Sequence, residues 1–565
     1  MTRIAGTFRE RLAGRPDAPV RGRSALALAL FVLALLCWAF ASPVGSSPDD
    51  DFHIANIYCL SDEASCRSND AAWPEGQPGW PADPLDRQRE PWSGLEAIYP
   101  DLWSFPTPRQ LPCYVLNGTI DYFPNPAEPA DCLSAEDQLS NSPRTVDNVY
   151  YYPNLNYRFL SLFTQDTIRS SVAAWRIVVV LVSVLMAGLS LGLSLRRWRR
   201  PLLLTWVICS VPFGAFLMSS HNPSAWAVVG TVAMVGPGIA ALQQPKKDGK
   251  TAARLGVVLL SVLLVLGGRS EGILFLTVAV AVILLLGLKE GRVARTATWV
   301  IGFVALLAFL VVALGGGSIL LNRLGETYLL TRPEAIPLWG ALMDAPLVYA
   351  AYTTPLGWLD IQMPQAVMIP AGFAFMGAIM LGLARVNSRK GMALLITFLV
   401  PLIATVGIRV VSGAGLQSRY ILPLVYLFML VALAPVADKA LPRWGHAQWA
   451  TLVACLTVAN SLALLYLELR YVTGINAAAS PGALFEASTP DWWWSIWFSP
   501  GVNWVMGSIA FLAGLLTALS LVPRWEAQDP PGASPRGSEG TVDPAGDTSR
   551  ADEGASCPVP TAPQT

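Results

Sequence analysis

The sequence predicts an all-α polytopic membrane protein with about twelve transmembrane helices and one large loop on the outer face. Three observations lead to this fold class. Of the 565 residues, 53% are hydrophobic and only 14% are charged, which is too apolar for a water-soluble chain. Apolar runs of about 17–22 residues recur along the chain, which is the length that a membrane-spanning helix needs. Basic residues concentrate in every second connector between these runs, as they do in cytoplasmic loops.

The apolar runs give the predicted spans in order along the chain. The fifth run is short, and the sequence GGRSEG joins it tightly to the sixth. These two runs are therefore either two spans or one broken hairpin. The predicted spans are 24–41, 173–195, 202–218, 224–242, 255–268, 271–288, 297–314, 366–384, 391–411, 420–436, 448–467 and 503–522.

The basic connectors set the predicted orientation. The N-terminal segment 1–23 is rich in arginine, and RRWRR, PKKDGK, KEGRVAR, SRKG and ADKALPR follow on the same side. Positive loops of this kind remain in the cytoplasm, so both termini are predicted to be cytoplasmic. The first run, with AFA before Ser42, also fits a secretory signal, but its length favours a retained anchor. Residues 523–565, rich in Pro, Gly, Ser and Asp, are typical of a disordered tail.

The outer segment 43–172 differs in composition from the spans. It is rich in Pro, Asp, Trp and Tyr, and it holds four of the eight cysteines. An even number of cysteines in an exported loop predicts two disulfides, with three alternative pairings, in an otherwise irregular segment. Farther along, the tryptophans of TPDWWWSIWFSP are typical of an interfacial belt. The loop cysteines are Cys59, Cys66, Cys113 and Cys132.

Polar side chains gather where predicted spans meet the outer face. SPDDDFH follows the first span, HNPSAW joins the third to the fourth, GRSEG joins the fifth to the sixth, and LQSRYILPL opens the tenth. Ionisable groups at a membrane boundary are costly unless they are solvated, paired or used in function. The residues concerned are Asp49, Asp50, Asp51, His53, His221, Asn222, Arg269, Glu271, Arg409 and Arg419.

Each of these groups also has a simple structural interpretation. Arg269 and Glu271 can pair with each other, His221 and Asn222 can cap a turn, and Arg419 can reach to the interface. The aspartate run can form a solvated turn. The functional interpretation is that adjacent carboxylates act as a general base or hold a divalent cation. Arginines on neighbouring helices would then bind a phosphate, which indicates a lipid-phosphate substrate on the outer face.

The order and placement of these motifs resemble a family of predicted bacterial membrane proteins called DUF2142. SPDDDFH is similar to the PDE…H signature of that family, and QSRY is similar to its QGRY motif. The sequence differs from the signature in Asp50, where glutamate is usual, and in the additional acid Asp51. The family is similar in architecture to the GT-C glycosyltransferases, which use polyprenyl-phosphate sugars. The resemblance implies a protein of the bacterial plasma membrane and marks Asp49, Asp50 and His53 as catalytic positions.

The function that this resemblance implies is sugar transfer from a polyprenyl-phosphate donor to a cell-envelope glycan or lipid-linked acceptor. Asp50 is the predicted base, with Asp49 second, and His53 orients a carboxylate or contacts phosphate. Arg419 is predicted to bind the donor phosphate, with Arg269, Glu271, His221 and Asn222 at the same site. The alternatives are a transporter or flippase of a lipid-linked saccharide and a non-catalytic scaffold of envelope assembly. A net charge of zero gives no reason to expect nucleic acid as a partner.

Overall fold

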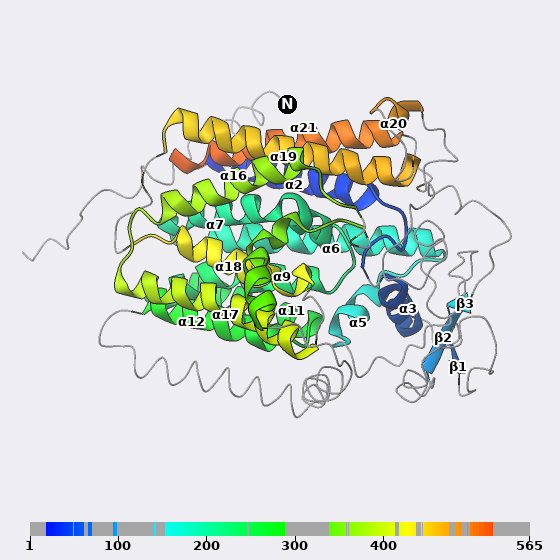
Figure 1. Ribbon diagram of the computed structural model, residues 1–565, viewed down its shortest axis with the longest axis horizontal. Helices are drawn as coiled ribbons and strands as arrows, with labels where there is room; N and C mark the ends of the chain where they lie inside the picture. The colour runs from blue at the N-terminus through cyan, green and yellow to red at the C-terminus, as the bar shows by residue number, and fades with distance from the viewer. Residues whose placement is uncertain are drawn as a thin grey trace, which may run out of the picture.

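The computed structural model shows a bundle of apolar helices (Figure 1). Within the part of the chain that it describes, nine helices are long and apolar enough to cross a membrane, and they coincide with nine of the predicted spans. The shorter apolar helices 272–287 and 422–432 coincide with the sixth and tenth predicted spans. The seventh predicted span, 297–314, lies outside the described residues. These are 18–48, 50–61, 66–69, 94–98, 141–142, 153–245, 248–288, 338–357, 359, 361–412, 417–436, 442, 444–473, 481–486, 494 and 498–523.

The helices of the spans follow the order of the sequence. The chain forms two helices joined by the tight turn of GGRSEG, of which the first is long enough to cross a membrane and the second is shorter, so both alternatives for this pair stay open. The third span is continuous through α7, η3 and α8. The elements are α2 (Ala18–Phe40), α6 (Ile168–Leu193), α7 (Arg196–Cys209), η3 (Ser210–Gly214), α8 (Ala215–Met218), α9 (Ser224–Ala233), α10 (Val235–Gln243), α11 (Gly249–Gly268), α12 (Gly272–Gly287), α16 (Gln365–Gly382), α17 (Ser388–Ser412), α18 (Leu422–Ala432), α19 (His446–Thr473) and α21 (Pro500–Leu519).

The centre of the bundle is formed by the third and fourth spans. Within each of these spans 94% of the most apolar stretch is buried, against 17–44% in the other long spans. A helix that is apolar on all sides packs well only when other helices surround it, whereas a lipid-facing helix leaves one side uncovered. The connector between these two central spans, which contains HNP, therefore emerges in the middle of one end of the bundle.

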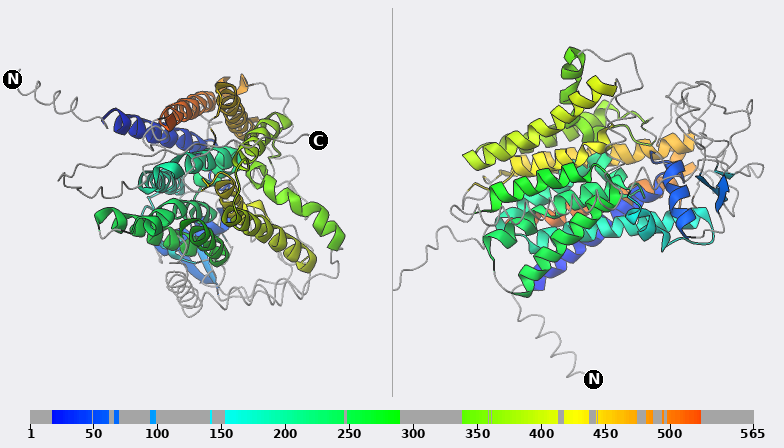
Figure 2. Two further views of the ribbon diagram at one scale, coloured as in Figure 1. Left: turned by 90° about the vertical axis from the view of Figure 1, so that its left-hand side faces the viewer. Right: turned by 90° about the horizontal axis from the view of Figure 1, so that it is seen from below.

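The first span packs against the last two. Asn503 Nδ2 of α21 donates a hydrogen bond to the carbonyl oxygen of Cys37 at 2.8 Å, and Trp38 Nε1 donates to Asn460 Oδ1 of α19 at 3.1 Å. Gly507 allows a close approach, because a Cβ at that position would lie 2.7 Å from the Cβ of Cys37. The two helices lie next to each other in the left view of Figure 2, α2 in blue and α21 in red-brown. The first apolar run is thus an integral helix of the bundle.

The segment before α16 is more ordered and lies deeper than the sequence predicted. Residues 315–365 were expected to form an outer connector, but α15 and η6 pack among α16, α17 and α18. Tyr349 stacks on Phe398 of α17 at 5.1 Å. Asp344 pairs with Arg409 at 2.5 Å, so Arg409 serves this segment rather than the candidate site. The bounds are α15 (Leu338–Asp344) and η6 (Ala345–Thr353).

Segment 43–172, which the sequence predicts to be outside, contains regular elements, contrary to the expectation of an irregular segment. Two helices and a small antiparallel sheet of order β1-β2-β3 form within it, at one end of the bundle (Figure 1). The four loop cysteines have side chains outside the described residues, so the two disulfides stay a prediction.

The short elements of the whole chain are α3 (Asp50–Ser61), β1 (Cys66–Asn69), β2 (Gly94–Ile98), β3 (Asn141–Ser142), α5 (Leu155–Ser161), η7 (Ser418–Tyr420) and α20 (Ala483–Glu486).

Candidate functional site

Asp50 is fixed at the N-terminus of α3. Ser47 N–H donates a hydrogen bond to Asp50 Oδ2 at 2.9 Å, while Asp50 N–H donates to the Ser47 carbonyl at 3.1 Å. A carboxylate in this position also interacts favourably with the helix dipole. Asp50 is fully buried, whereas an aspartate in a solvated turn would be exposed to water. Asp49 and the Asp51 side chain lie outside the described residues, so the choice among the three acids stays a prediction.

A histidine and an arginine from other parts of the bundle face the Asp50 carboxylate. His221 Nε2, from the turn between α8 and α9, lies 3.1 Å from Oδ1. Arg176 Nη2, from α6, lies 3.9 Å from Oδ2. All three side chains are at most 2% exposed. A buried carboxylate is tolerated when such partners offset its loss of hydration.

Arg176 also holds the turn between α2 and α3 in place. Its guanidinium lies 5.5 Å from the ring of Trp494, which is 3% exposed and so is packed inside the protein. The other tryptophans of TPDWWWSIWFSP lie outside the described residues, so the interfacial belt stays a prediction for them. The planar fork of donors on the guanidinium suits several acceptors at once. Arg176 donates to Ala39 O at 2.7 Å, Ser42 O at 2.8 Å, Pro43 O at 2.7 Å and Ser46 Oγ at 3.1 Å.

His53 joins the same helix to the end of the outer loop. Its Nδ1 and the Tyr157 hydroxyl of α5 form a hydrogen bond of 2.8 Å, and both side chains are buried. His53 lies three residues after Asp50, so the two side chains project from the same side of α3. The described contact of His53 orients α5 against α3, while its predicted contact with phosphate stays a prediction.

The turn between α8 and α9 docks against the aspartate segment. Asn222 Oδ1 accepts a hydrogen bond from Ser224 N–H at 2.9 Å, which closes the turn just before α9. Asn222 Nδ2 donates to the Pro48 carbonyl at 2.9 Å. The adjacent His221 ring meets the ring of Trp175 edge-on at 5.8 Å. The capping interpretation of Asn222 is therefore confirmed, and the same side chain also places His221 beside Asp50.

The two arginine motifs meet on Tyr420. The Arg269 guanidinium lies 4.3 Å from the Tyr420 ring, and Arg419 lies 5.1 Å from it. Arg419 Nη2 donates to the Tyr420 hydroxyl at 3.1 Å. Arg269 pairs with Glu271 through two contacts of 3.3 Å, as the simple interpretation predicted. Both arginines are 2% exposed, so Arg419 does not extend to the surface as an interfacial arginine would.

The arginine cluster adjoins the Asp50 cluster. A Cβ built on Gly268, which precedes Arg269, would lie 2.7 Å from the Pro223 carbonyl oxygen. Glycine is therefore needed at this contact, where the α11–α12 turn packs on the turn that carries His221. Residues predicted from the sequence thus lie in two clusters at one end of the bundle, on turns that contact each other. The first contains Asp50, His221 and Arg176, and the second contains Arg269, Glu271, Arg419 and Tyr420.

Sequence reasoning missed two members of these clusters. Arg176 lies in the apolar run VAAWRIVVV, and a charge at that depth was the available signal. Tyr420 was part of the QSRY motif but was given no role. For a divalent cation, no group of three His, Cys, Asp or Glu side chains able to share a metal occurs among the described residues.

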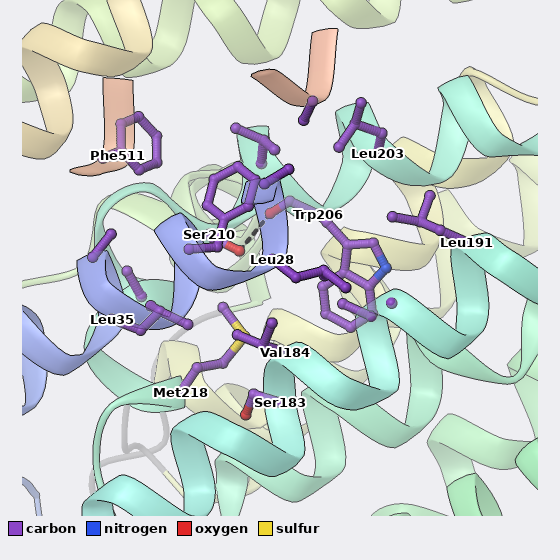
Figure 3. A pocket seen from close by; sticks show the side chains of 18 of the residues that line it. Leu28, Leu35, Ser183, Val184, Leu191, Leu203, Trp206, Ser210, Met218 and Phe511 are labelled. Atoms are coloured by element: carbon purple, nitrogen blue, oxygen red, sulfur yellow. Dashed lines mark hydrogen bonds between the residues drawn. The ribbon is translucent and has the colours of Figure 1, made fainter. Parts of the chain in front are cut away.

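An apolar cavity of about 220 Å³ lies between α2, α6, α7 and α21 (Figure 3). None of the predicted site residues is among those that line it. Met218 lines it, however, and that residue ends α8 just before the turn of His221. The cavity therefore extends along the bundle to the end of α8, three residues before His221. Other lining side chains are Leu28, Leu35, Val184, Leu203 and Phe511.

The fold and the two clusters define a polytopic helical membrane protein with a buried polar site at one end of the bundle. The chain belongs to the family of predicted membrane proteins DUF2142, whose pattern matches residues 30–428. This range includes all of the predicted site residues. No curated protein and no solved structure matches the chain.

Proposed function

We propose that this protein transfers a sugar from a polyprenyl-phosphate donor to a cell-envelope glycan or lipid-linked acceptor on the outer face of the bacterial plasma membrane. The observation that carries the proposal is the pairing of the two clusters. A buried carboxylate with its own histidine and arginine adjoins two buried arginines that share one tyrosine. The first cluster suits proton removal and the second suits phosphate binding.

The reaction is an exchange of bonds at the anomeric carbon. The acceptor hydroxyl gives up its proton to the Asp50 cluster while its oxygen bonds to that carbon. The bond from the carbon to the phosphate oxygen breaks, and polyprenyl phosphate leaves with the electron pair. Arg269 and Arg419 stabilise the charge that develops on the leaving phosphate. No nucleotide hydrolysis is needed, because the lipid-linked donor carries its own activation.

The apolar cavity supports a lipid-linked donor. An isoprenoid chain gains about 25 cal/mol for each Å² of apolar surface that it removes from water. The cavity offers Leu28, Leu203 and Phe511 for such a contact, and it reaches α8 below the site turn. A donor with its chain in this cavity would bring its phosphate toward the end of the bundle where the arginines lie.

The experiment is transfer by the purified protein in lipid vesicles with a panel of radiolabelled polyprenyl-phosphate sugars. Asp50→Asn should insert normally and lose transfer by about 10²–10⁴-fold, the usual effect of removing a general base system. Asp51→Asn is the matched control and should lose much less. Equal, small effects of the two substitutions would show that the aspartates only form a turn.

Transport of a lipid-linked saccharide is the second candidate, because α19 carries a buried acid. Glu468 is fully buried and accepts a hydrogen bond from Asn503 Nδ2 at 2.6 Å. Intramembrane carboxyls are typical of proton-coupled transporters. Glu468 lies in the last two turns of α19, however, and not at the midplane where transporter sites occur. Movement of a fluorescent polyprenyl-phosphate sugar across vesicles without transfer would favour the transporter.

A further inference from the structure

Both oxygens of the Asp50 carboxylate face other groups of the protein at close range. Oδ2 accepts from Ser47 N–H at 2.9 Å and faces Arg176 at 3.9 Å. Oδ1 faces His221 Nε2 at 3.1 Å, without the alignment of a hydrogen bond. Protein groups thus surround the residue that the sequence marks as the base, and an acceptor hydroxyl would have to displace one of them to reach it.

Neither ring nitrogen of His221 has a hydrogen-bond partner among the described residues, but Nε2 lies 3.1 Å from the carboxylate and no such contact is found for Nδ1. The side chain is 0% exposed. A buried nitrogen that is left without a hydrogen bond is destabilising, which favours a ligand that can donate to it. The position of the ring is fixed by the turn that Asn222 closes and by the edge of Trp175. A ligand that reached Nδ1 would meet a lone pair held in a fixed orientation.

The carboxylate favours one of the two neutral forms of the ring. An anionic oxygen beside Nε2 stabilises a proton on Nε2, so the neutral ring keeps its lone pair on Nδ1. The charges facing this ring come from Asp50 on α3 and, behind it, from Arg176 on α6. Arg269 and Glu271 lie on the turn that packs against Pro223.

We infer that His221, through Nδ1, is the group that takes the proton from the acceptor hydroxyl, and that Asp50 is its positioning partner. The inference rests on the proposed function and changes the role of Asp50 within it. As the acceptor oxygen bonds to the anomeric carbon, its proton moves to Nδ1, which yields an imidazolium. Asp50 then offsets the positive charge on the ring, and the proton leaves to solvent after polyprenyl phosphate departs.

The first test is His221→Gln in the vesicle transfer assay. The glutamine amide can place an N–H near Asp50 Oδ1, as Nε2 does, but it offers no basic nitrogen in place of Nδ1. A structural histidine would tolerate this change, whereas a catalytic one would lose about 10²–10⁴-fold in the rate of transfer. His446→Gln is the matched control, because His446 is exposed at the first residue of α19. It should transfer at the rate of the unaltered protein.

The second test does not depend on activity. The chain has only three histidines, so ¹⁵N labelling of histidine gives three sets of ring signals. Spectra of His53→Asn and His446→Gln assign the signal of His221. The neutral His221 ring should carry its proton on Nε2, and Asp50→Asn should remove that preference. A neutral ring with its proton on Nδ1 would overturn the inference, whatever the transfer rate.

The outcomes separate the inference from the proposed function. Transfer by the unaltered protein that persists within about threefold in His221→Gln would overturn the role of His221 and leave sugar transfer standing. Absence of transfer by the unaltered protein with every donor would overturn the proposed function, and the inference with it. Should His221→Gln fail to insert, the ring signals of the unaltered protein decide the question.

Discussion

Removal of the Arg176 guanidinium is the most direct probe of how the site is built. Arg176→Met keeps a long side chain in the space but removes every donor. Three backbone carbonyls and the Ser46 hydroxyl then lose the hydrogen bonds that Arg176 donates at 2.7–3.1 Å. Asp50 loses its cation at 3.9 Å while it remains buried.

The expected effect is a loss of about 3–5 kcal/mol in the free energy of unfolding, the usual result of removing one partner of a buried ion pair. Three unsatisfied carbonyls at about 1–3 kcal/mol each would give a similar or larger total. We expect the smaller loss, about 3–5 kcal/mol, because the turn lies at the end of the bundle and water can reach the carbonyls when it relaxes. The measurement is reversible unfolding in mixed detergent micelles, followed by tryptophan fluorescence.

Two further variants make this prediction specific. Arg158→Met is the matched control, since Arg158 is exposed on α5, and it should change the free energy by less than about 0.5 kcal/mol. The double variant with Asp50→Asn should lose less than the sum of the two single changes, because no buried charge is then left without a partner. A loss below about 1 kcal/mol in Arg176→Met would refute the assignment of Arg176 as the support of this turn.

Two other predictions concern the donor and the outer loop. Arg419→Lys should retain insertion but require more donor for half-maximal transfer, because an ammonium cannot reproduce the guanidinium fork beside Tyr420; unchanged donor dependence would remove Arg419 from the phosphate site. The four cysteines of segment 43–172 should react with an impermeant thiol reagent on intact cells only after reduction. Labelling without reduction would refute the disulfides, and these thiols are Cys59, Cys66, Cys113 and Cys132.

The helices were predictable because each span satisfies its own backbone hydrogen bonds. Apolar length alone locates such a segment, so eleven predicted spans match apolar helices in the described part of the chain. Depth in the bundle was not predictable in the same way. Residues 338–353 lie within the predicted outer connector 315–365, yet Tyr349 and Tyr352 pack on phenylalanines in the middle of α16, α17 and α18. That packing depends on contacts between residues far apart in the sequence, which the spacing of apolar residues along the chain does not reveal.

The site shows why the structural and functional interpretations of a turn residue are not exclusive. A side chain at a helix terminus satisfies backbone groups that would otherwise lack partners, so local sequence explains its presence completely. Asn222 satisfies the Ser224 N–H at the start of α9 in this way, and the same amide donates to Pro48 in a segment far away along the chain. The second contact brings His221 to Asp50, and no local pattern contains it.

The same argument applies to Arg269. Its pair with Glu271 is local and was expected from GRSEG, but its contact with Tyr420 joins two motifs from different spans. The pair with Glu271 holds the Arg269 guanidinium in one orientation. Less side-chain entropy is then lost when a phosphate binds. The simple role therefore supports the functional one, because a side chain already fixed by its neighbours is better placed to bind a ligand.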